Sequence, residues 1–481
     1  MKYLSFVMFF CLFLYSGRAF SQEKLSIEQM LWLAGENSVD TEKAEKLAQI
    51  SYWQYRLHQS NNKPRFVLNG ELPNLSRTII PVTQNDGLEI FRARSLATSY
   101  LNISLLQNIT PIGGTFFASS QLNRIDIFRP ARTTSYLSYP VLVGVRQPIG
   151  QFNSLKWANK IEPLRFVESQ KKYKEDLEFS KIKGLKLFFK LLLAQENLET
   201  TKIQQANADT LLVLAKNRFS VGKITENELL RNEINLLQAQ QQYAQALNEY
   251  EFAQKQLQIF LKKNQPLQLE YPKNIFENIN IDEEATLEKV RKNGRKVIEL
   301  QRKLLEADKE VAQARANAGL QMDVTLSFGL SKDANELPNV YRQLKDQENA
   351  RVSFQIPILD WQRGKAEVKI ATLQQQYAQI QAEQELLAME QELLQLIRNW
   401  QLAKKQWVII EKTKAIAEKS YLMTLQDYQN GFTTITELDK ALAAKNAAFQ
   451  NYLKQLETLW TDYYTLRAFT LYDFEKNLPL D

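Results

Sequence analysis

The sequence contains one cysteine and one histidine, Cys11 and His58, among its 481 residues. Cys11 lies in an apolar N-terminal run that we expect to be removed, so the mature chain would have no disulfide and no thiolate metal site. One histidine cannot supply a histidine pair for a metal, and there is no Gly-rich phosphate loop. We therefore predict no enzymatic activity, no cofactor and no bound metal. His58 stands alone on a polar helix end, where a surface position is expected.

Long apolar runs are also scarce. The N-terminal run, residues 4–15, follows Lys2 and is followed by Ala19-Phe20-Ser21, the pattern of a secretory signal peptide. A membrane anchor is the weaker alternative, because the run is short for a bilayer span. We predict a signal peptide over residues 1–21 with cleavage before Gln22. No later segment has enough uninterrupted apolar residues for a transmembrane helix.

Charge of one sign is not concentrated anywhere. The 61 basic and 54 acidic residues give a net charge of +7, and both kinds are scattered through every segment. Nucleic-acid binding would need a clustered basic face. The pattern favours a solvated helical surface and no nucleic-acid partner.

Helix-breaking residues are almost absent from residues 164–264, which contain no proline and only Gly184 and Gly222. Good helix formers dominate this stretch. We predict two very long antiparallel helices over residues ~152–264 that turn back at Gly222. The second arm, residues 225–261, would be roughly 55 Å long at about 1.5 Å per residue. Helices of this length need long partners to be stable.

The same design occurs a second time. Residues 358–478 again lack proline and contain only Gly364 and Gly431. Gly431 lies 209 residues after Gly222, and Pro357 lies 209 residues after Pro148. Chance rarely keeps such a register, so the chain is one unit written twice. We predict a first repeat over residues 22–265 and a second over 266–481, whose helical hairpin (~361–474) turns at Gly431.

Each repeat is predicted to open with two helices. In the first repeat they cover residues 25–60, with a break at residues 35–38. Their counterpart is residues 281–317, broken at Asn293-Gly294.

Strand-like segments follow, over residues ~64–149 and ~322–358. Apolar and polar residues alternate at residues 141–146, 323–328 and 351–356, which predicts two strands in each repeat with one apolar face. Residues 73–97 and 331–349 are polar and charged, and we expect them to be exposed loops. A further hairpin over residues ~98–128 is indicated, but whether it joins the main sheet stays open.

Alternation of this kind suits a soluble sandwich and also a membrane barrel. Four strands cannot close a barrel, and lipid does not tolerate an open sheet edge. If the strands cross a membrane, several chains must share one barrel, and the long helices would pack into a second, helical tube. The core-facing stripe of that tube would hold Leu229, Leu230, Ile234, Leu237 and Leu247.

Three segments carry a family resemblance: residues 218–225 with Leu229-Leu230, residues 427–434 with Leu438, and residues 352–361 leading into Lys365. With the doubled order of strands and helical hairpins, they resemble the TolC-type outer membrane efflux proteins, also called outer membrane factors. The resemblance covers essentially all of the mature chain. It implies a mainly α fold with β-strands, a homotrimer with a shared β-barrel in outer-membrane lipid, and a periplasmic α-barrel. It also implies docking onto a periplasmic adaptor and an inner-membrane pump.

The resemblance further implies two kinds of site. The helix turns resemble the tips that meet the adaptor, and their residues are Val221, Gly222, Lys223, Asn430, Gly431 and Phe432. A carboxylate ring with a tyrosine would narrow the tube near the tips, and its residues would be Glu226, Glu228, Tyr428, Glu437 and Asp439. Plainer readings stay open, since a glycine also lets the chain reverse and a first-turn acid also complements a helix N-terminus.

Two function classes remain open. The first is a passive outer-membrane exit duct of a tripartite efflux or type I secretion system, for small molecules, ions or polypeptides. The second is a periplasmic coiled-coil adaptor or structural protein. The doubled repeat favours the duct, because one hairpin and a lipoyl-like sandwich would be expected of an adaptor. Which cargo, pump and adaptor are involved cannot be read from the residues.

Overall fold

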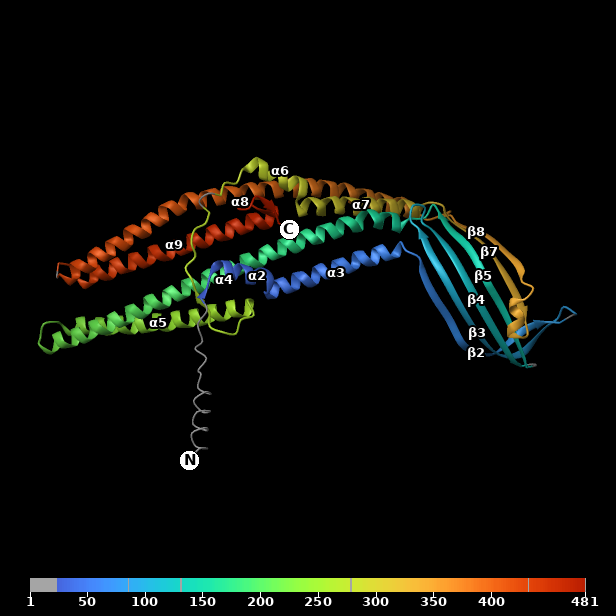
Figure 1. Ribbon diagram of the computed structural model, residues 1–481, viewed down its shortest axis with the longest axis horizontal. Coiled ribbons are helices and arrows are strands. Elements are labelled where there is room, and N and C mark those ends of the chain that lie inside the picture. The colour runs from blue at the N-terminus through green and yellow to red at the C-terminus, as the bar shows by residue number, and fades with distance from the viewer. Residues whose placement is uncertain (1–23, 85, 130–131, 277–278, 431, 481) are drawn as a thin grey trace, which may run out of the picture. The chain divides into compact units, whose positions relative to one another are not determined.

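The computed structural model describes residues 24–480 except 85, 130–131, 277–278 and 431. The predicted signal peptide, residues 1–21, and the predicted turn residue Gly431 lie outside the described residues. The fold is mainly helical with one large sheet, which confirms the predicted fold class (Figure 1).

The chain forms two compact units, and each unit takes segments from both halves of the sequence. The helical unit consists of the chain up to Ala48, Gln170–Gly294 and the chain from Ala388 onwards. The sheet unit consists of Gln49–Ser169 and Arg295–Leu387. The two sequence repeats are therefore interleaved in space rather than folded separately.

Two long helical hairpins dominate the chain. The first is made of α4 (Ser154–Ser220) and α5 (Glu226–Phe260), and the second of α8 (Arg363–Gln429) and α9 (Ile435–Thr470). Helices α4 and α8 both have 67 residues, and their bounds differ by the same 209 residues that separate the two glycines. The shorter helices α2 (Ile27–Glu36), α3 (Val39–Asn61), α6 (Glu283–Asn293) and α7 (Arg295–Ala318) confirm that each half opens with two helices.

One antiparallel sheet of six strands lies in the sheet unit (Figure 1). Its order is β2 (Arg65–Thr83), β3 (Glu89–Ile109), β4 (Gly114–Arg129), β5 (Thr133–Ile149), β7 (Gln321–Ala334) and β8 (Lys345–Gln355). A 3-10 turn, η1 (Leu337–Tyr341), joins the last two strands. Two small ladders pair β1 (Lys24–Leu25) with β6 (Gln268–Leu269) and β9 (Tyr472–Asp473) with β10 (Leu478–Pro479).

The prediction that residues 73–97 form a loop is wrong. Residues 73–83 and 89–97 belong to β2 and β3, which pair along a long ribbon that includes Ile79 opposite Ala93 and Pro81 opposite Phe91. Most side chains of this ribbon are exposed, so its sequence lacks the apolar alternation of a half-buried strand. Residues 331–349 are likewise only partly loop, since β7 runs to Ala334 and β8 begins at Lys345. The open question about residues ~98–128 is answered, because β3 and β4 both join the main sheet.

The core of the helical unit is an aromatic cluster around Phe276. The Phe276 ring lies 5.3 Å from the Trp400 ring, 4.8 Å from the Trp460 ring and 4.9 Å from the Tyr463 ring, measured between centroids. All four side chains are almost fully buried. Burying each of them stabilises the fold by roughly 2–3 kcal/mol. The cluster therefore ties the segment before α6 to the second helical hairpin.

A buried ion cluster holds the C-terminal segment of the helical unit in place. Arg467 in α9 donates hydrogen bonds to Glu178 in α4 at 3.1 Å and to Asp473 in β9 at 2.8 Å. Burial alone would raise the pKa of Asp473, but Arg467 together with the hydrogen bonds that this carboxylate accepts lowers the pKa below its ordinary value. Removing one partner from such a group is costly, because the remaining charges stay buried without a counter-ion.

Gly184, one of the two glycines of the first long stretch, marks a close helix contact within the helical unit. A Cβ atom there would lie 2.7 Å from Met30 Sδ, 3.0 Å from Ala34 Cβ and 3.2 Å from Phe260 Cε1. The absent side chain lets α2 approach α4, while α5 packs against the same point. This glycine therefore serves packing, and a substitution would force the helices apart.

We predict that Gly184→Val destabilises the protein by about 2 kcal/mol, because overpacking a filled contact costs about 1–3 kcal/mol. Thermal unfolding of the purified protein in detergent measures the change. The matched control is Ala206→Val on the exposed surface of the same helix, for which a change within about 0.5 kcal/mol is expected. Equal effects of the two variants would contradict the packing role of Gly184.

Candidate functional site

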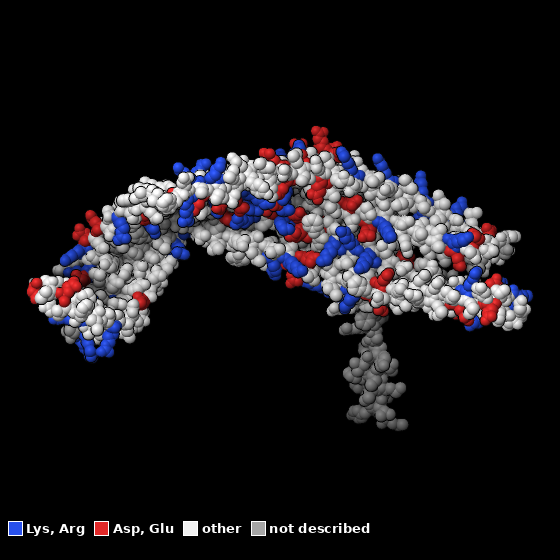
Figure 2. Space-filling view, turned by 180° about the vertical axis from the view of Figure 1, so that it is seen from behind, with Lys and Arg blue, Asp and Glu red and all other residues white. Residues whose placement is uncertain are grey.

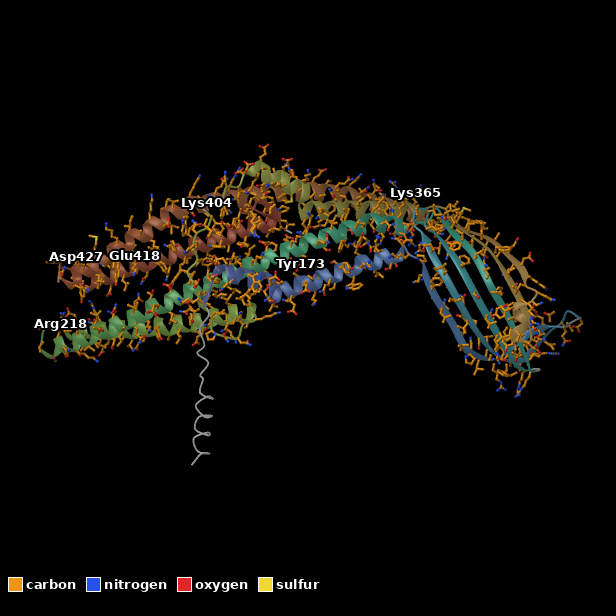
Figure 3. The ribbon with its side chains drawn as sticks, viewed as in Figure 1. Tyr173, Arg218, Lys365, Lys404, Glu418 and Asp427 are labelled. Atoms are coloured by element: carbon orange, nitrogen blue, oxygen red, sulfur yellow. The ribbon has the colours of Figure 1, made fainter. Side chains whose placement is uncertain are left out.

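The first hairpin turns at Gly222, as predicted. Gly222 has a φ of +71°, and the Lys223 N–H donates to the Arg218 carbonyl at 2.9 Å. A Cβ at Gly222 would meet no atom within 4 Å. The glycine is required by its left-handed backbone and not by lack of space. Arg218 lies near this tip, and Asp427 lies near the tip of the second hairpin (Figure 3).

The helix that follows this turn starts with a capping box. The Thr225 hydroxyl accepts from the Glu228 N–H at 3.3 Å, and the Glu228 carboxylate accepts from the Thr225 N–H at 3.0 Å. Both bonds satisfy amide groups that the first helical turn leaves without partners. Glu228, predicted for the gate, therefore has a structural role in the single chain, which supports the plainer reading for this residue.

The second turn is built in a related but not identical way. The Asn430 N–H donates to the Gln426 carbonyl at 3.0 Å, and the Phe432 N–H donates to the Asp427 carbonyl at 2.8 Å. Thr434 caps α9 by accepting from the Glu437 N–H at 3.4 Å. The Glu437 carboxylate is paired with Lys440 at 2.9 Å. Gly431 itself lies outside the described residues.

Both turns expose apolar side chains. Phe432 in the second turn is 82% exposed, Val221 in the first turn is 65% exposed, and Lys223 in the first turn is exposed as well. Large apolar side chains that are exposed at the end of a hairpin mark a surface for a binding partner. The predicted docking residues thus form two tips with apolar surface available for contact.

The five predicted gate residues are only partly alike in their surroundings. Glu226, Glu228 and Glu437 are exposed, and Tyr428 is 38% exposed. Asp439 is exposed as well, although partial desolvation raises the pKa of its carboxyl above the ordinary value. Among the described residues, no hydrogen bond or ion pair joins two of these five. A single chain does not bring them together.

The six-stranded sheet has one apolar face. A row of residues that lie opposite one another crosses the sheet from Phe66 in β2 to Glu348 in β8. The side chains on the face of the sheet that contains this row are mostly apolar. Members of this apolar face that are exposed to solvent are Phe66, Leu68, Leu101, Ile103, Val141, Val145, Leu326, Phe328, Val352 and Phe354. An uncovered apolar face of this size is typical of a surface that meets lipid or another protein.

The opposite face of the sheet is largely polar. Its side chains include Asn69, Asn102, Ser104, Ser119, Gln121, Asn123, Asp323, Thr325, Arg351 and Ser353. Arg146 and Asp323 form an ion pair on this polar face, at 2.9 Å. The sheet is thus mostly apolar on one side and largely polar on the other.

The helical unit also leaves apolar stripes uncovered. In α5, Leu230, Ile234 and Leu237 follow one another at helical spacing and are at least half exposed. Sequence reasoning predicted this stripe but missed a second one in α8, made of Leu402, Ile409, Ile416 and Met423, all more than half exposed. The seven-residue spacing of the second stripe is the signal of a coiled-coil seam, and it is visible in the sequence.

Charged side chains of both signs are interspersed over the helices on the face that Figure 2 shows. The described part of the chain has no group of His, Cys, Asp and Glu residues placed to hold a metal ion. Among the described residues, no helix is both apolar enough and long enough to span a bilayer.

The fold and these surfaces define an outer-membrane channel protein of the efflux type. The family model described as outer membrane efflux protein matches residues 115–261 and 286–470, more than half of the chain. The chain therefore belongs to the outer membrane efflux protein family, which confirms the resemblance seen in the sequence. No curated protein matches the chain by sequence.

Solved structures share the fold. The Campylobacter jejuni CmeC outer membrane channel matches with a TM-score of 0.65 and 15% identity, over 94% of this chain and 88% of that chain. The open state of the Neisseria gonorrhoeae MtrE outer membrane channel matches with a TM-score of 0.61 and 15% identity, over 92% and 88%. The Vibrio cholerae outer membrane protein VceC matches with a TM-score of 0.56 and 10% identity, over 92% and 95%.

We predict that Glu228→Gln and Glu228→Ala behave differently if Glu228 acts as a cap. Glutamine also forms a capping box, whereas alanine removes it at a cost of about 1 kcal/mol, which corresponds to roughly fivefold faster amide exchange. Hydrogen exchange of the first turn of α5 measures this, with Thr210→Ala, an exposed position near the C-terminal end of α4, as the control. Equal exchange in the glutamine and alanine variants would contradict the capping role.

Proposed function

We propose that this protein is the outer-membrane exit duct of a tripartite efflux system, through which cargo passes passively to the outside. The observation that carries the proposal is the six-stranded sheet with an exposed apolar face and a polar face. In a bilayer, the apolar face suits lipid and the polar face suits a water-filled lumen. Membership of the efflux family supports the same conclusion.

The helical hairpins supply the second half of the duct. Apolar stripes on α5 and on α8 stay exposed in one chain, so each chain has surfaces that another copy can cover. Three copies packed through these stripes form a closed helical tube that extends the duct into the periplasm. The Gln, Glu and Lys side chains of the opposite faces then line water.

The exposed tips are the docking surface for a periplasmic adaptor, which links the duct to an inner-membrane pump. Val221 and Phe432 provide apolar contact, and Lys223 and Asn430 provide polar groups around them. Gly222 leaves the backbone open to a partner, because a Cβ there would have no neighbours. A coiled-coil partner with complementary apolar residues fits such a surface.

The gate lies close to the tips. Glu437 and Asp439 in the first turns of α9, with Tyr428 at the end of α8, recur three times in a trimer. Glu226 and Glu228 hold the corresponding places in α5. A ring of carboxylates raises the local concentration of cations and excludes anions. The duct is therefore closed and cation-selective at rest, and it opens when its partners draw the tips apart.

We expect small cation-selective currents from the detergent-extracted oligomer in planar bilayers. Glu437→Gln should weaken the selectivity by roughly a factor of a few, because it removes one charge per chain from the ring. The matched control is Glu42→Gln, which removes an exposed carboxylate of α3. A monomeric mass in detergent, or failure to insert, would refute the duct and favour the periplasmic coiled-coil alternative.

We also predict that cation selectivity weakens as the pH falls. A carboxyl group loses its charge below its pKa, and burial raises the pKa of Asp439 above 3.8. The decline therefore begins at a higher pH than an ordinary aspartate would give. In Asp439→Asn the contribution of Asp439 to this titration disappears. An unchanged pH profile in the variant would exclude Asp439 from the selective ring.

A further inference from the structure

The sheet of this chain has one more hairpin than its family match includes. The match to the efflux family begins at residue 115, at the start of β4, so β2 and β3 lie before it. Helices α2 and α3 begin 256 residues before α6 and α7, whereas α4 begins 209 residues before α8. The first half thus carries 47 additional residues between the starts of α3 and α4. The hairpin of β2 and β3, from Arg65 to Ile109, accounts for nearly all of them.

This hairpin is fully integrated in the sheet. Strand β3 pairs with β4 from Ile109 to Ser95, and β2 pairs with β3 along its whole length. The apolar face continues into the hairpin through Phe66, Leu68, Leu101 and Ile103. A hairpin with a different role, such as a cap above the sheet, would not need to extend the apolar face.

Within the described chain, β2 pairs only with β3 and β8 pairs only with β7, so both edges of the sheet are open. We propose that the β8 edge of one copy pairs with the β2 edge of the next, so that three sheets close into one barrel of eighteen strands. The proposal rests on the trimeric duct proposed above. It assigns β2, a strand outside the family match, as the interface between subunits.

Four properties of the two edges support this pairing. Their directions are opposite, because the strands alternate from β2 to β8, so closure keeps the sheet antiparallel with an even number of strands. The 11 residues of β8 are a suitable length for a membrane strand. Apolar residues alternate on the same face in both edges, with Phe66 and Leu68 in β2 and Val352 and Phe354 in β8. In lipid, an open edge would leave backbone groups without partners.

A register follows from the path of partners across the sheet. That path leaves β2 at Phe66 and reaches β8 at Glu348, six residues before Phe354. If Phe354 faces Phe66 of the next copy, crossing one copy shifts the register along the strands by six residues. Three copies then add eighteen, equal to the number of strands. A barrel with equal shear and strand number has a tilt of about 36°, within the range of membrane barrels.

The same register gives compatible neighbours across the interface. Leu68 faces Val352 on the apolar side, and Asn69 faces Arg351 on the polar side. Glu71 is then a diagonal neighbour of Arg351, within reach of a charge interaction. Pro73 lies in the bulge between Glu71 and Asn74, where a missing N–H breaks no ladder bond. The continuous ladder would therefore run along β2 from Arg65 to Glu71.

An eighteen-stranded barrel is about one and a half times as wide as a twelve-stranded one, which the four strands β4, β5, β7 and β8 would give. Barrels of 16–18 strands leave an open aqueous channel. The outer-membrane end of this duct is thus wide, and its narrowest point lies in the helical part.

Engineered disulfides test the interface directly, because the only native cysteine, Cys11, lies in the predicted signal peptide. We expect the pair Asn69→Cys with Arg351→Cys to link neighbouring subunits on mild oxidation and to give a covalent trimer on a non-reducing gel. A register shifted by two residues would move the link to Glu71→Cys with Arg351→Cys. The controls are Leu68→Cys, on the opposite face, and Thr83→Cys, at the far end of β2, each with Arg351→Cys. Facing pairs should link roughly tenfold more than the controls, because a disulfide tolerates little misplacement.

The outcomes separate the two proposals. If the protein is trimeric in detergent and conducts, but neither facing pair links more than the controls, the eighteen-stranded barrel is refuted and the duct stands. Electron microscopy of the unmodified oligomer gives an independent measurement, and a twelve-stranded barrel would also refute the inference. A monomer in detergent refutes the duct itself. The single Arg351→Cys variant, tested for conductance, shows that the substitution leaves the fold intact.

Discussion

Unpaired backbone groups at a sheet edge are the constraint on which the rest of this structure depends. In water an edge strand can bind solvent, but in lipid every N–H and C=O needs a protein partner. A single chain offers six strands with an exposed apolar face and two open edges, β2 and β8. The same chain cannot satisfy those edges by itself without bending the sheet into a barrel of six strands, fewer than the smallest single-chain membrane barrels have. The proposed association of identical copies therefore completes the sheet itself.

The helices also need partners, in their case to bury apolar side chains. Helix α5 and helix α8 each expose a stripe of large apolar side chains, although the middle of the helical unit is well filled around Phe276 and Trp400. The stripes follow helical and heptad spacing, which is the pattern of a surface that packs against another helix. The chain thus has two kinds of surface that a partner can complete. The sheet edges need hydrogen bonds, and the helix stripes need apolar burial.

Much of the fold can be predicted from the residues, because long helices and repeats leave strong periodic signals. The 209-residue offset in the sequence separates the bounds of α4 and α8 to the residue, although the predicted starts of the two hairpins, ~152 and ~361, are each two residues early. The ribbon of β2 and β3 was missed, since Arg77, Arg92 and Arg94 suggest a loop when no buried face imposes alternation. The packing reason for Gly184 was also invisible, because Met30 and Phe260 meet it only after folding. The gate residues resist prediction for another reason, since their distances depend on the symmetry of several copies.

The two halves of the chain differ in a way that the proposed trimer explains. Their hairpins are almost equal in length, with α5 and α9 at 35 and 36 residues, because a tube built from both hairpins needs tips at one level. Their strands in the six-stranded sheet are unequal in number, with four from the first half and two from the second. A barrel tolerates such an addition when it comes as a hairpin, since two further strands keep the directions alternating and return the chain to the same side. In the proposed trimer, the helical tube thus requires the two hairpins to be nearly equal in length. The barrel can accept additional strands, one hairpin at a time.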